Sequence, residues 1–258
     1  MHALPPRYVQ AEIDGALAIV RDDVVGFVRQ AVMAHGTLYD FGARHPEAQT
    51  LQGRGPLYVV PGAGRDRWVI RHLRHGGLLA PLTRDRFLRS RRPRPFNELR
   101  VAAHLRSLAI PTPEVTAAIV YPSAALYRGD VARLEVPGAR DLAECLFGDP
   151  PLDAAERIVA LGAAGRLLRW LHTRGVIHPD LNLRNVLIEW AGRPPRPYIL
   201  DLEKCRIVAR VPTRRRRQML ARIRRSARRF EARTGRHITD EEWHAFHTAY
   251  AEVRHEEE

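Results

Sequence analysis

Three polar residues, Asp180, Asn185 and Asp201, constrain the fold of this chain more than any other feature. Asn185 follows Asp180 by five residues, and two short apolar runs separate it from Asp201. The apolar runs are typical of buried strands, and the segment between them, rich in glycine and proline, is typical of a turn. These segments are residues 186–188, 198–200 and 191–197. The pattern predicts that the three polar side chains lie on loops beside a small hairpin.

Carboxylate and amide side chains at these positions suit the transfer of a phosphoryl group from ATP. That reaction needs a carboxylate beside the attacking hydroxyl and oxygen ligands for Mg²⁺, because positioning and charge neutralisation do most of the catalytic work. Protein kinases supply an Asp in an H-R-D loop, an Asn shortly after it, and the Asp of a later D-F-G. The spacing predicts Asp180 as the catalytic base, Asn185 and Asp201 as Mg²⁺ ligands, and His178 as a scaffold residue.

Four upstream residues predict how the ATP phosphates would be held. Gly53 and Gly55 have the spacing of a phosphate-covering loop, although a lone G-x-G is more often a simple turn. Arg71 ends the run W-V-I-R, where protein kinases place the lysine of V-A-I-K. An arginine grips phosphate as a planar fork, so its role differs from that of a point-charge ammonium. Glu98 would pair with this cation from a helix, and a solvated helical glutamate is the alternative.

The residues that follow Arg71 include His72, Arg74 and His75, with two glycines after them. Glycine adopts many backbone conformations, so this run predicts a flexible cationic loop. Such a loop would contact phosphate or an acidic sugar, with a solvated turn as the other interpretation.

Hydrophobic periodicity predicts short strands first and helices later, an α+β arrangement whose order fits the two lobes of a kinase. Residues 1–50 are expected to form an N-terminal extension with one helix, and residues 51–258 one domain with lobes at about 51–134 and 135–258. Expected strands cover residues 57–60, 68–72 and 117–121. Expected helices cover residues 22–34, 96–108, 153–173, 213–233 and 240–253.

The net charge of +13 indicates an anionic partner, and charge alone leaves nucleic acid and an anionic membrane surface both open. The expected helix at 213–233 combines an apolar stripe with an arginine-rich face. We expect its stripe to pack on the core, with the arginine face outward. The chain has a single lysine, Lys204, among 42 lysines and arginines.

Two further features bear on the compartment. No run of 18 or more apolar residues occurs, and the N-terminus lacks a charged-then-apolar signal with a small-residue cleavage site. We therefore expect an unexported protein without a transmembrane segment. Cys145 and Cys205 are too few for a disulfide framework and have no metal-ligand spacing, so we expect two reduced thiols.

Read together, these motifs resemble the 3-deoxy-D-manno-octulosonic acid (Kdo) kinases of the lipopolysaccharide kinase family. The matching segments are G-R-G at 53–55, W-V-I-R-H-L-R-H-G-G-L at 68–78, F-N-E-L at 96–99, I-P-T-P at 110–113, Y-R-G-D at 127–130, H-P-D-L-N-L-R-N at 178–185 and D-L-E-K at 201–204. The run after Arg71 and the Asp-Leu-Asn form of the loop distinguish this family from aminoglycoside, choline and protein kinases. An arginine at position 71 is normal for the family.

The resemblance implies a protein-kinase-like fold with a small β-rich N-lobe and a helical C-lobe. It implies an ATP- and Mg²⁺-dependent enzyme that phosphorylates the 4-hydroxyl of Kdo on Kdo-lipid A during lipopolysaccharide core biosynthesis. In that role we expect Asp180, Asn185, Arg71 and Glu98 to be catalytic, with Gly53, Gly55, Arg71 and Asp201 at the nucleotide. We expect peripheral attachment to the cytoplasmic side of the bacterial inner membrane, an anionic surface, and no nucleic-acid partner.

Two other functions stay open from the sequence. The first is a kinase for another acceptor, such as heptose, a different small molecule or a protein. The second is a catalytically inactive kinase-like protein that binds membrane or nucleic acid through its arginine-rich helix. The presence of Asp180, Asn185 and Asp201 together favours a working kinase. The oligomeric state is not encoded in any readable pattern.

Overall fold

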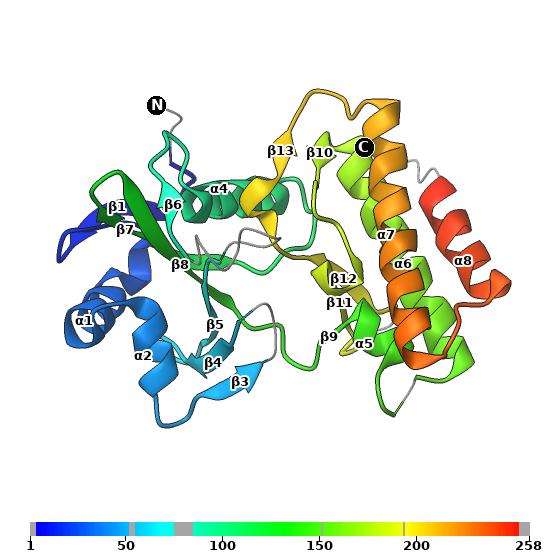
Figure 1. Ribbon diagram of the computed structural model, residues 1–258, viewed down its shortest axis with the longest axis horizontal. Coiled ribbons are helices and arrows are strands. Elements are labelled where there is room, and N and C mark those ends of the chain that lie inside the picture. Colours follow the sequence, from blue (N-terminus) through cyan, green and yellow to red (C-terminus); the bar gives the residue numbers. More distant parts are fainter. Residues whose placement is uncertain (1–3, 52–54, 75–84, 151, 193, 253–258) are drawn as a thin grey trace. The chain divides into compact units, whose positions relative to one another are not determined.

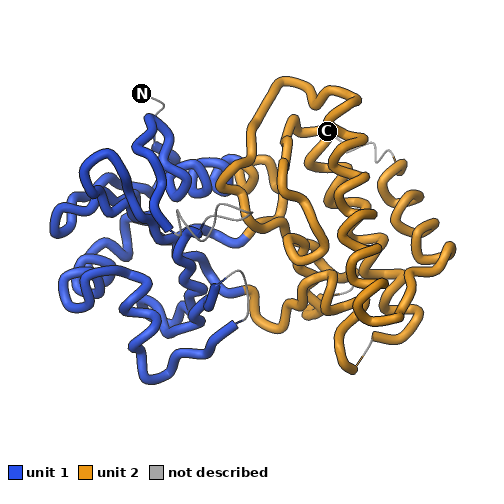
Figure 2. Tube along the Cα trace, viewed as in Figure 1, with its two compact units in different colours: residues 1–104, 113–135 blue, residues 105–112, 136–258 orange. Residues whose placement is uncertain are grey.

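The computed structural model describes residues 4–51, 55–74, 85–150, 152–192 and 194–252. The chain forms two compact units, shown in Figure 2. Unit 1 comprises residues 1–104 and 113–135, and unit 2 comprises residues 105–112 and 136–258. Unit 1 is built on a sheet and unit 2 mainly on helices (Figure 1), which confirms the predicted α+β class.

Unit 1 contains an eight-stranded antiparallel sheet in the order β1-β2-β7-β8-β5-β4-β3, with β6 pairing β8. Its strands are β1 (Tyr8–Ile13), β2 (Ala16–Arg21), β3 (Gln49–Leu51), β4 (Leu57–Pro61), β5 (Arg67–His72), β6 (Phe87–Leu88), β7 (Val115–Ser123) and β8 (Leu126–Leu134). Its helices are η1 (Asp22–Val24), α1 (Val25–His35), α2 (Leu38–Arg44) and most of α4 (Arg94–Ser107). The predicted strands β4, β5 and β7 and helices α1 and α4 are confirmed.

The first 50 residues add two strands and two helices to unit 1. Asp14 and Gly15, both at positive φ, form the turn between β1 and β2, and β2 pairs with β7. Helix α1 places Val28 and Val32 in a core that also contains Trp68 and Ile119. The segment that the sequence presents as an extension therefore shares a sheet and a core with the strands after it.

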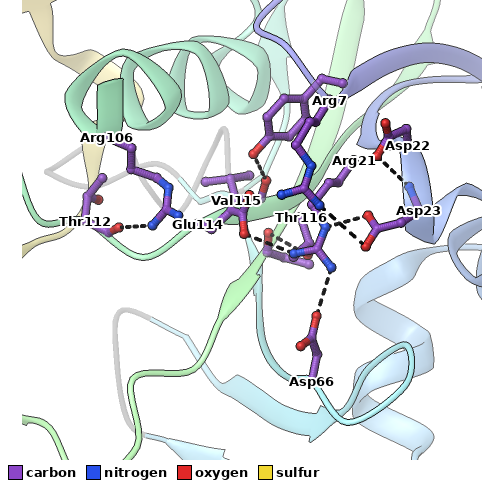
Figure 3. Close-up of polar contacts among 12 residues, drawn as sticks. Arg7, Arg21, Asp22, Asp23, Asp66, Arg106, Thr112, Glu114, Val115 and Thr116 are labelled. Carbon is purple, nitrogen blue, oxygen red and sulfur yellow. Dashed lines mark hydrogen bonds and ion pairs between the residues drawn. The ribbon is translucent and has the colours of Figure 1, made fainter. Parts of the chain in front are cut away.

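A buried arginine connects three segments of unit 1, as Figure 3 shows. Arg21 is the last residue of β2, and its side chain is only 8% exposed. Its Nε donates to Asp23 at 2.6 Å. Its two terminal nitrogens donate to Asp66 at 2.9 Å and to Glu114 at 3.0 Å. Asp66 precedes β5 and Glu114 precedes β7, so one guanidinium links the end of β2 to the starts of two other strands.

Unit 2 contains α5 (Leu142–Phe147), α6 (Ala154–Thr173), α7 (Thr213–Thr234) and α8 (Asp240–Ala251). Asp153 and Glu156 form a capping box at the start of α6, and Thr239 and Glu242 form another at α8. Gly165 of α6 lies so close to the carbonyl of Phe246 in α8 that a Cβ would not fit. The predicted helices at 153–173, 213–233 and 240–253 are confirmed, the last ending two residues earlier among the described residues.

Short strands complete unit 2. They are β9 (Arg140–Asp141), β10 (Val176–Ile177), β11 (Val186–Glu189), β12 (Arg196–Ile199) and β13 (Arg206–Ile207), with the turns η2 (Leu183–Asn185) and η3 (Leu202–Lys204). Strands β11 and β12 form the predicted hairpin, and β10 pairs with β13. These two pairings bracket the polar loop, because residues 178–185 connect β10 to β11 and residues 200–205 connect β12 to β13.

Candidate active site

His178 begins the polar loop of unit 2 and is fully buried. Its Nε2 donates to the carbonyl of Leu200 at 2.9 Å, which ties the loop to the end of β12. Burial lowers the pKa of His178, so the ring is neutral and carries its proton on Nε2. His178 is thus a structural link within the site, in agreement with the scaffold role predicted for it.

The backbone of Asp180 is held by two asparagines. Asn182 and Asn185 each donate through Nδ2 to the carbonyl of Asp180, at 2.9 and 3.1 Å. The side-chain oxygen of Asn182 also accepts from the N–H of Arg184, and this hydrogen bond caps the start of η2. These bonds fix the turn that carries the Asp180 carboxylate, which is about one third exposed. A fixed, partly exposed carboxylate meets the geometric requirement for a base that must reach a substrate hydroxyl.

Asp201 lies two residues after the end of β12, the strand that pairs with β11, and β11 begins directly after Asn185. The N–H of Leu200 donates to the carbonyl of Asn185 at 2.9 Å, so the two predicted metal ligands lie one residue apart across this bond. Asp201 has φ 62° and ψ 56°, the left-handed region, which Asp tolerates better than most residues. The structure therefore brings Asp180, Asn185 and Asp201 into one loop cluster of unit 2.

Asn185 and Asp201 have the chemistry to hold a magnesium ion. Asn185 uses Nδ2 to donate to Asp180, so its amide oxygen serves as an acceptor, and Asp201 adds a charged oxygen. Within the described parts of the chain, no group of three or more His, Cys, Asp or Glu could hold a metal by itself. Mg²⁺ takes one or two protein oxygens and completes its shell with phosphate oxygens and water.

Lys204 is a site residue to which the sequence analysis assigned no role. Its Nζ donates to Oδ2 of Asp180 at 2.7 Å, from the last residue of η3. The signal was present in the sequence, because this is the single lysine of an arginine-rich chain and lies three residues after Asp201. The cation beside the predicted base therefore comes from the segment that carries a predicted metal ligand.

Unit 1 places the predicted phosphate-organising pair together. Arg71, on β5, donates through a terminal nitrogen to Glu98, on α4, at 2.5 Å. Glu98 is buried and the Arg71 side chain is 21% exposed. The pairing expected from the sequence is confirmed, and the alternative of a solvated glutamate is wrong, because α4 turns Glu98 inward toward the sheet.

Of the two glycines predicted to cover the phosphates, the structure describes one. Gly53 lies outside the described residues. Gly55 is described, and a Cβ at that position would meet the guanidinium of Arg74 at 2.9–3.1 Å. Because glycine has no side chain, the arginine can lie directly against the backbone at this position. His75 and the glycines that follow it also lie outside the described residues.

His72 does not belong to a flexible cationic loop, and that expectation is wrong. It is the last residue of β5, where its Nδ1 lies 2.5 Å from Asp130 and its Nε2 lies 3.0 Å from Asp85. The buried Asp130 carboxylate also accepts from the N–H of Tyr39 and the hydroxyl of Tyr121. Charge pairing with two carboxylates fixes the ring, a constraint that spacing in the sequence does not reveal.

This arrangement predicts a pH-dependent contribution to stability. Burial alone would lower the pKa of His72, but hydrogen bonds and charges from Asp130 and Asp85 raise it above the ordinary value. A histidine whose pKa is higher in the folded than in the unfolded state stabilises the protein fully at pH values below its unfolded pKa of about 6.5. This stabilisation is lost as the pH rises through the pKa of the folded state. We expect the melting-temperature difference between wild type and His72→Gln to shrink as pH increases from about 6 to about 9. A difference that stays constant in calorimetry across this range would contradict a charged His72.

The fold and the loop cluster define a protein-kinase-like phosphotransferase architecture. The comparisons with known proteins agree with it, because residues 48–250 match the model of the "Lipopolysaccharide kinase (Kdo/WaaP) family". The chain belongs to this family.

Individual relatives and a solved structure are similar over much of the chain. A 3-deoxy-D-manno-octulosonic acid kinase of Actinobacillus succinogenes is 33% identical over 200 residues, covering 75% of this chain and 80% of the relative. A 3-deoxy-D-manno-octulosonic acid kinase of Vibrio cholerae is 33% identical over 155 residues, covering 59% of this chain and 62% of the relative. The structure of WaaP in complex with acyl carrier protein aligns with a TM-score of 0.53 and 16% identity, covering 79% of this chain and 78% of the other. The last likeness concerns the fold alone.

Proposed function

We propose that this chain is an ATP-dependent kinase that phosphorylates the 4-hydroxyl of Kdo on Kdo-lipid A in lipopolysaccharide core biosynthesis. The observation that carries this proposal is the position of Asp180, whose backbone carbonyl accepts from Asn182 and Asn185 and whose carboxylate accepts from Lys204, in the same loop cluster as Asp201. Family membership and the named Kdo kinases support the reaction and the acceptor.

In this mechanism Asp180 accepts the proton of the sugar hydroxyl as that oxygen attacks the γ-phosphorus, while the bond from the γ-phosphorus to the bridging oxygen breaks and ADP leaves. Lys204 orients the carboxylate through its bond to Oδ2, and Asn182 and Asn185 hold the loop backbone. Arg71, oriented by Glu98, would contact the ATP phosphates, with Gly53 and Gly55 covering them. Mg²⁺ bound by Asn185 and Asp201 would neutralise phosphate charge.

The direct test supplies purified protein with labelled ATP, Mg²⁺ and Kdo-bearing lipid A. A parallel panel contains heptose-bearing core sugar, other small molecules and a mixture of proteins as acceptors. We expect label on Kdo with the wild type and none after chelation of Mg²⁺. Transfer only to another acceptor would keep the kinase and reject Kdo, and absence of transfer to every acceptor would favour the inactive, binding-only protein.

Lys204 gives a sharper prediction within this mechanism. Lys204→Met removes the partner that orients Asp180, and a small misplacement of a catalytic group costs about 10- to 100-fold in rate. We expect kcat to fall by that order while KM for ATP changes little, and Lys204→Arg to restore part of the loss. The pair is more than 30% exposed on both sides, so thermal unfolding should change little. Unchanged kcat in Lys204→Met would show that the contact does not position the base.

The enzyme would work at the cytoplasmic face of the inner membrane, attached peripherally, because its proposed acceptor is anchored in lipid. No helix among the described residues is long and apolar enough to cross a bilayer. The net charge of +13 favours attraction to anionic lipid. WaaP was solved in complex with acyl carrier protein, so binding assays on this protein should also include acyl carrier protein.

A further inference from the structure

Helix α7 presents nine exposed arginines to solvent. They are Arg214, Arg215, Arg217, Arg222, Arg224, Arg225, Arg228, Arg229 and Arg233, called the arginine face below. At 3.6 residues per turn these positions fall within about half of the helix circumference. None of the ion pairs found among the described residues involves any of the nine. Among the described residues the arginine face is therefore a concentrated positive surface outside the ion pairs of the fold.

The other half of α7 is part of the core of unit 2. Met219, Ile223 and Ala227 are buried, and the hydroxyl of Ser226 accepts from the N–H of Leu183 in the catalytic loop at 3.3 Å. Arg184, the next loop residue, lies over the ring of Phe230, 5.5 Å from its centroid. The helix that carries the arginine face thus supports the loop that carries Asp180.

We propose that the arginine face of α7 is the surface through which this protein docks on an anionic phospholipid bilayer. The helix spans about 33 Å at 1.5 Å per residue, a length that lets many lipid headgroups bind at once. The apolar half is already buried, so α7 cannot insert its apolar side among acyl chains. Docking is then electrostatic and reversible, in contrast to that of an amphipathic helix with a free apolar face.

The geometry disfavours nucleic acid as the occupant. Single strands are held by exposed aromatic side chains on which bases stack, whereas the aromatic rings beside the arginine face, Phe230 and Trp243, are half-buried and lie under Arg184 and Arg224. A flat surface of negative charge requires only one exposed, positively charged side, which α7 offers.

This inference rests on the proposed function for its purpose. Because the catalytic loop contacts α7 directly, docking would hold the loop within about one helix diameter, roughly 10–12 Å, of the lipid surface. A sugar attached to lipid A is presented at that surface. The docking surface would therefore deliver the loop to its acceptor.

The test is vesicle binding without ATP or acceptor, so that it is independent of kinase activity. Wild type should sediment with vesicles of phosphatidylglycerol and phosphatidylcholine in about 0.1 M salt, but not with pure phosphatidylcholine, and about 1 M salt should release it. The triple variant Arg217→Gln, Arg225→Gln, Arg228→Gln should weaken binding on the order of 100-fold, at about 1 kcal/mol for each arginine.

The matched control is Arg29→Gln, Arg44→Gln, Arg65→Gln, which removes the same charge from exposed arginines of unit 1. We expect it to weaken vesicle binding by no more than about threefold, because these arginines are not part of the arginine face and the general attraction of net charge is screened in about 0.1 M salt. Equal losses in the two triples, absence of wild-type binding, or displacement of vesicles by RNA or DNA at equimolar phosphate would overturn the proposal. If the protein still transfers label to Kdo in detergent but does not bind vesicles, the docking proposal is wrong and the kinase assignment stands.

Discussion

Asp180→Asn is expected to reduce kcat about 1,000-fold or more while leaving the protein folded. An amide cannot accept the hydroxyl proton, so the variant loses base catalysis while it retains the size of the side chain. It also loses the charge that Lys204 contacts. Steady-state transfer of labelled phosphate to the acceptor measures kcat, and circular dichroism with thermal unfolding checks the fold.

The control for this substitution is Asp149→Asn, which makes the same chemical change in unit 2. The Asp149 side chain is 94% exposed, and its nearest cation, Arg236, lies 3.8 Å away. Its kcat should equal that of the wild type within about twofold, since exposed ion pairs contribute little. If Asp180→Asn retained more than about a tenth of wild-type kcat, Asp180 would not be the base and the assignment of the loop would be wrong.

The catalytic loop is predictable from sequence because its chemistry depends on spacing along one short segment. Asp180 and Asn185 are joined by a single turn, and apolar runs on either side form the strands that fix it. Asp201 comes close through the β11-β12 hairpin, whose alternating pattern and proline-rich turn are local signals. Spacing, alternation and turn residues within one short segment can be recognised in a single sequence.

Contacts between residues far apart in the sequence are harder to predict. Lys204 and Asp180 are 24 residues apart, and His72 meets Asp130 across 58 residues, so neither contact follows from local periodicity. The hairpin of β1 and β2 is a different case. Asp14-Gly15 between alternating apolar residues is a strong local turn signal, but its pairing with β7 depends on residues about 100 positions away. The sequence thus carried a local hairpin signal that the sequence analysis did not use, and only the fold shows that the hairpin belongs to the sheet.

Arg21→Met is expected to cost about 2–4 kcal/mol of the unfolding free energy of unit 1, the largest stability effect that we predict. The substitution keeps much of the side-chain volume but leaves Asp23, Asp66 and Glu114 clustered around the place of their shared cation (Figure 3). Glu114 is the most buried of the three, at 14% exposure. Because Asp23 and Asp66 can recover water, the effect should fall below that of a fully buried charge.

Arg7→Met tests whether charge alone explains that loss. Arg7 lies 4.0 Å from Asp23 with 62% of its side chain exposed, so its removal should cost less than about 1 kcal/mol despite an equal change in net charge. The Arg21 hydrogen bond lowers the pKa of Asp23, so this stabilisation is present above a pH of about 4 and is lost as pH falls through the folded value. Chemical denaturation with hydrogen exchange on β2 and β7 measures both variants. Equal destabilisation by the two substitutions would mean that Arg21 acts through long-range charge, whereas the structure predicts that it acts as a buried tie between three strand ends.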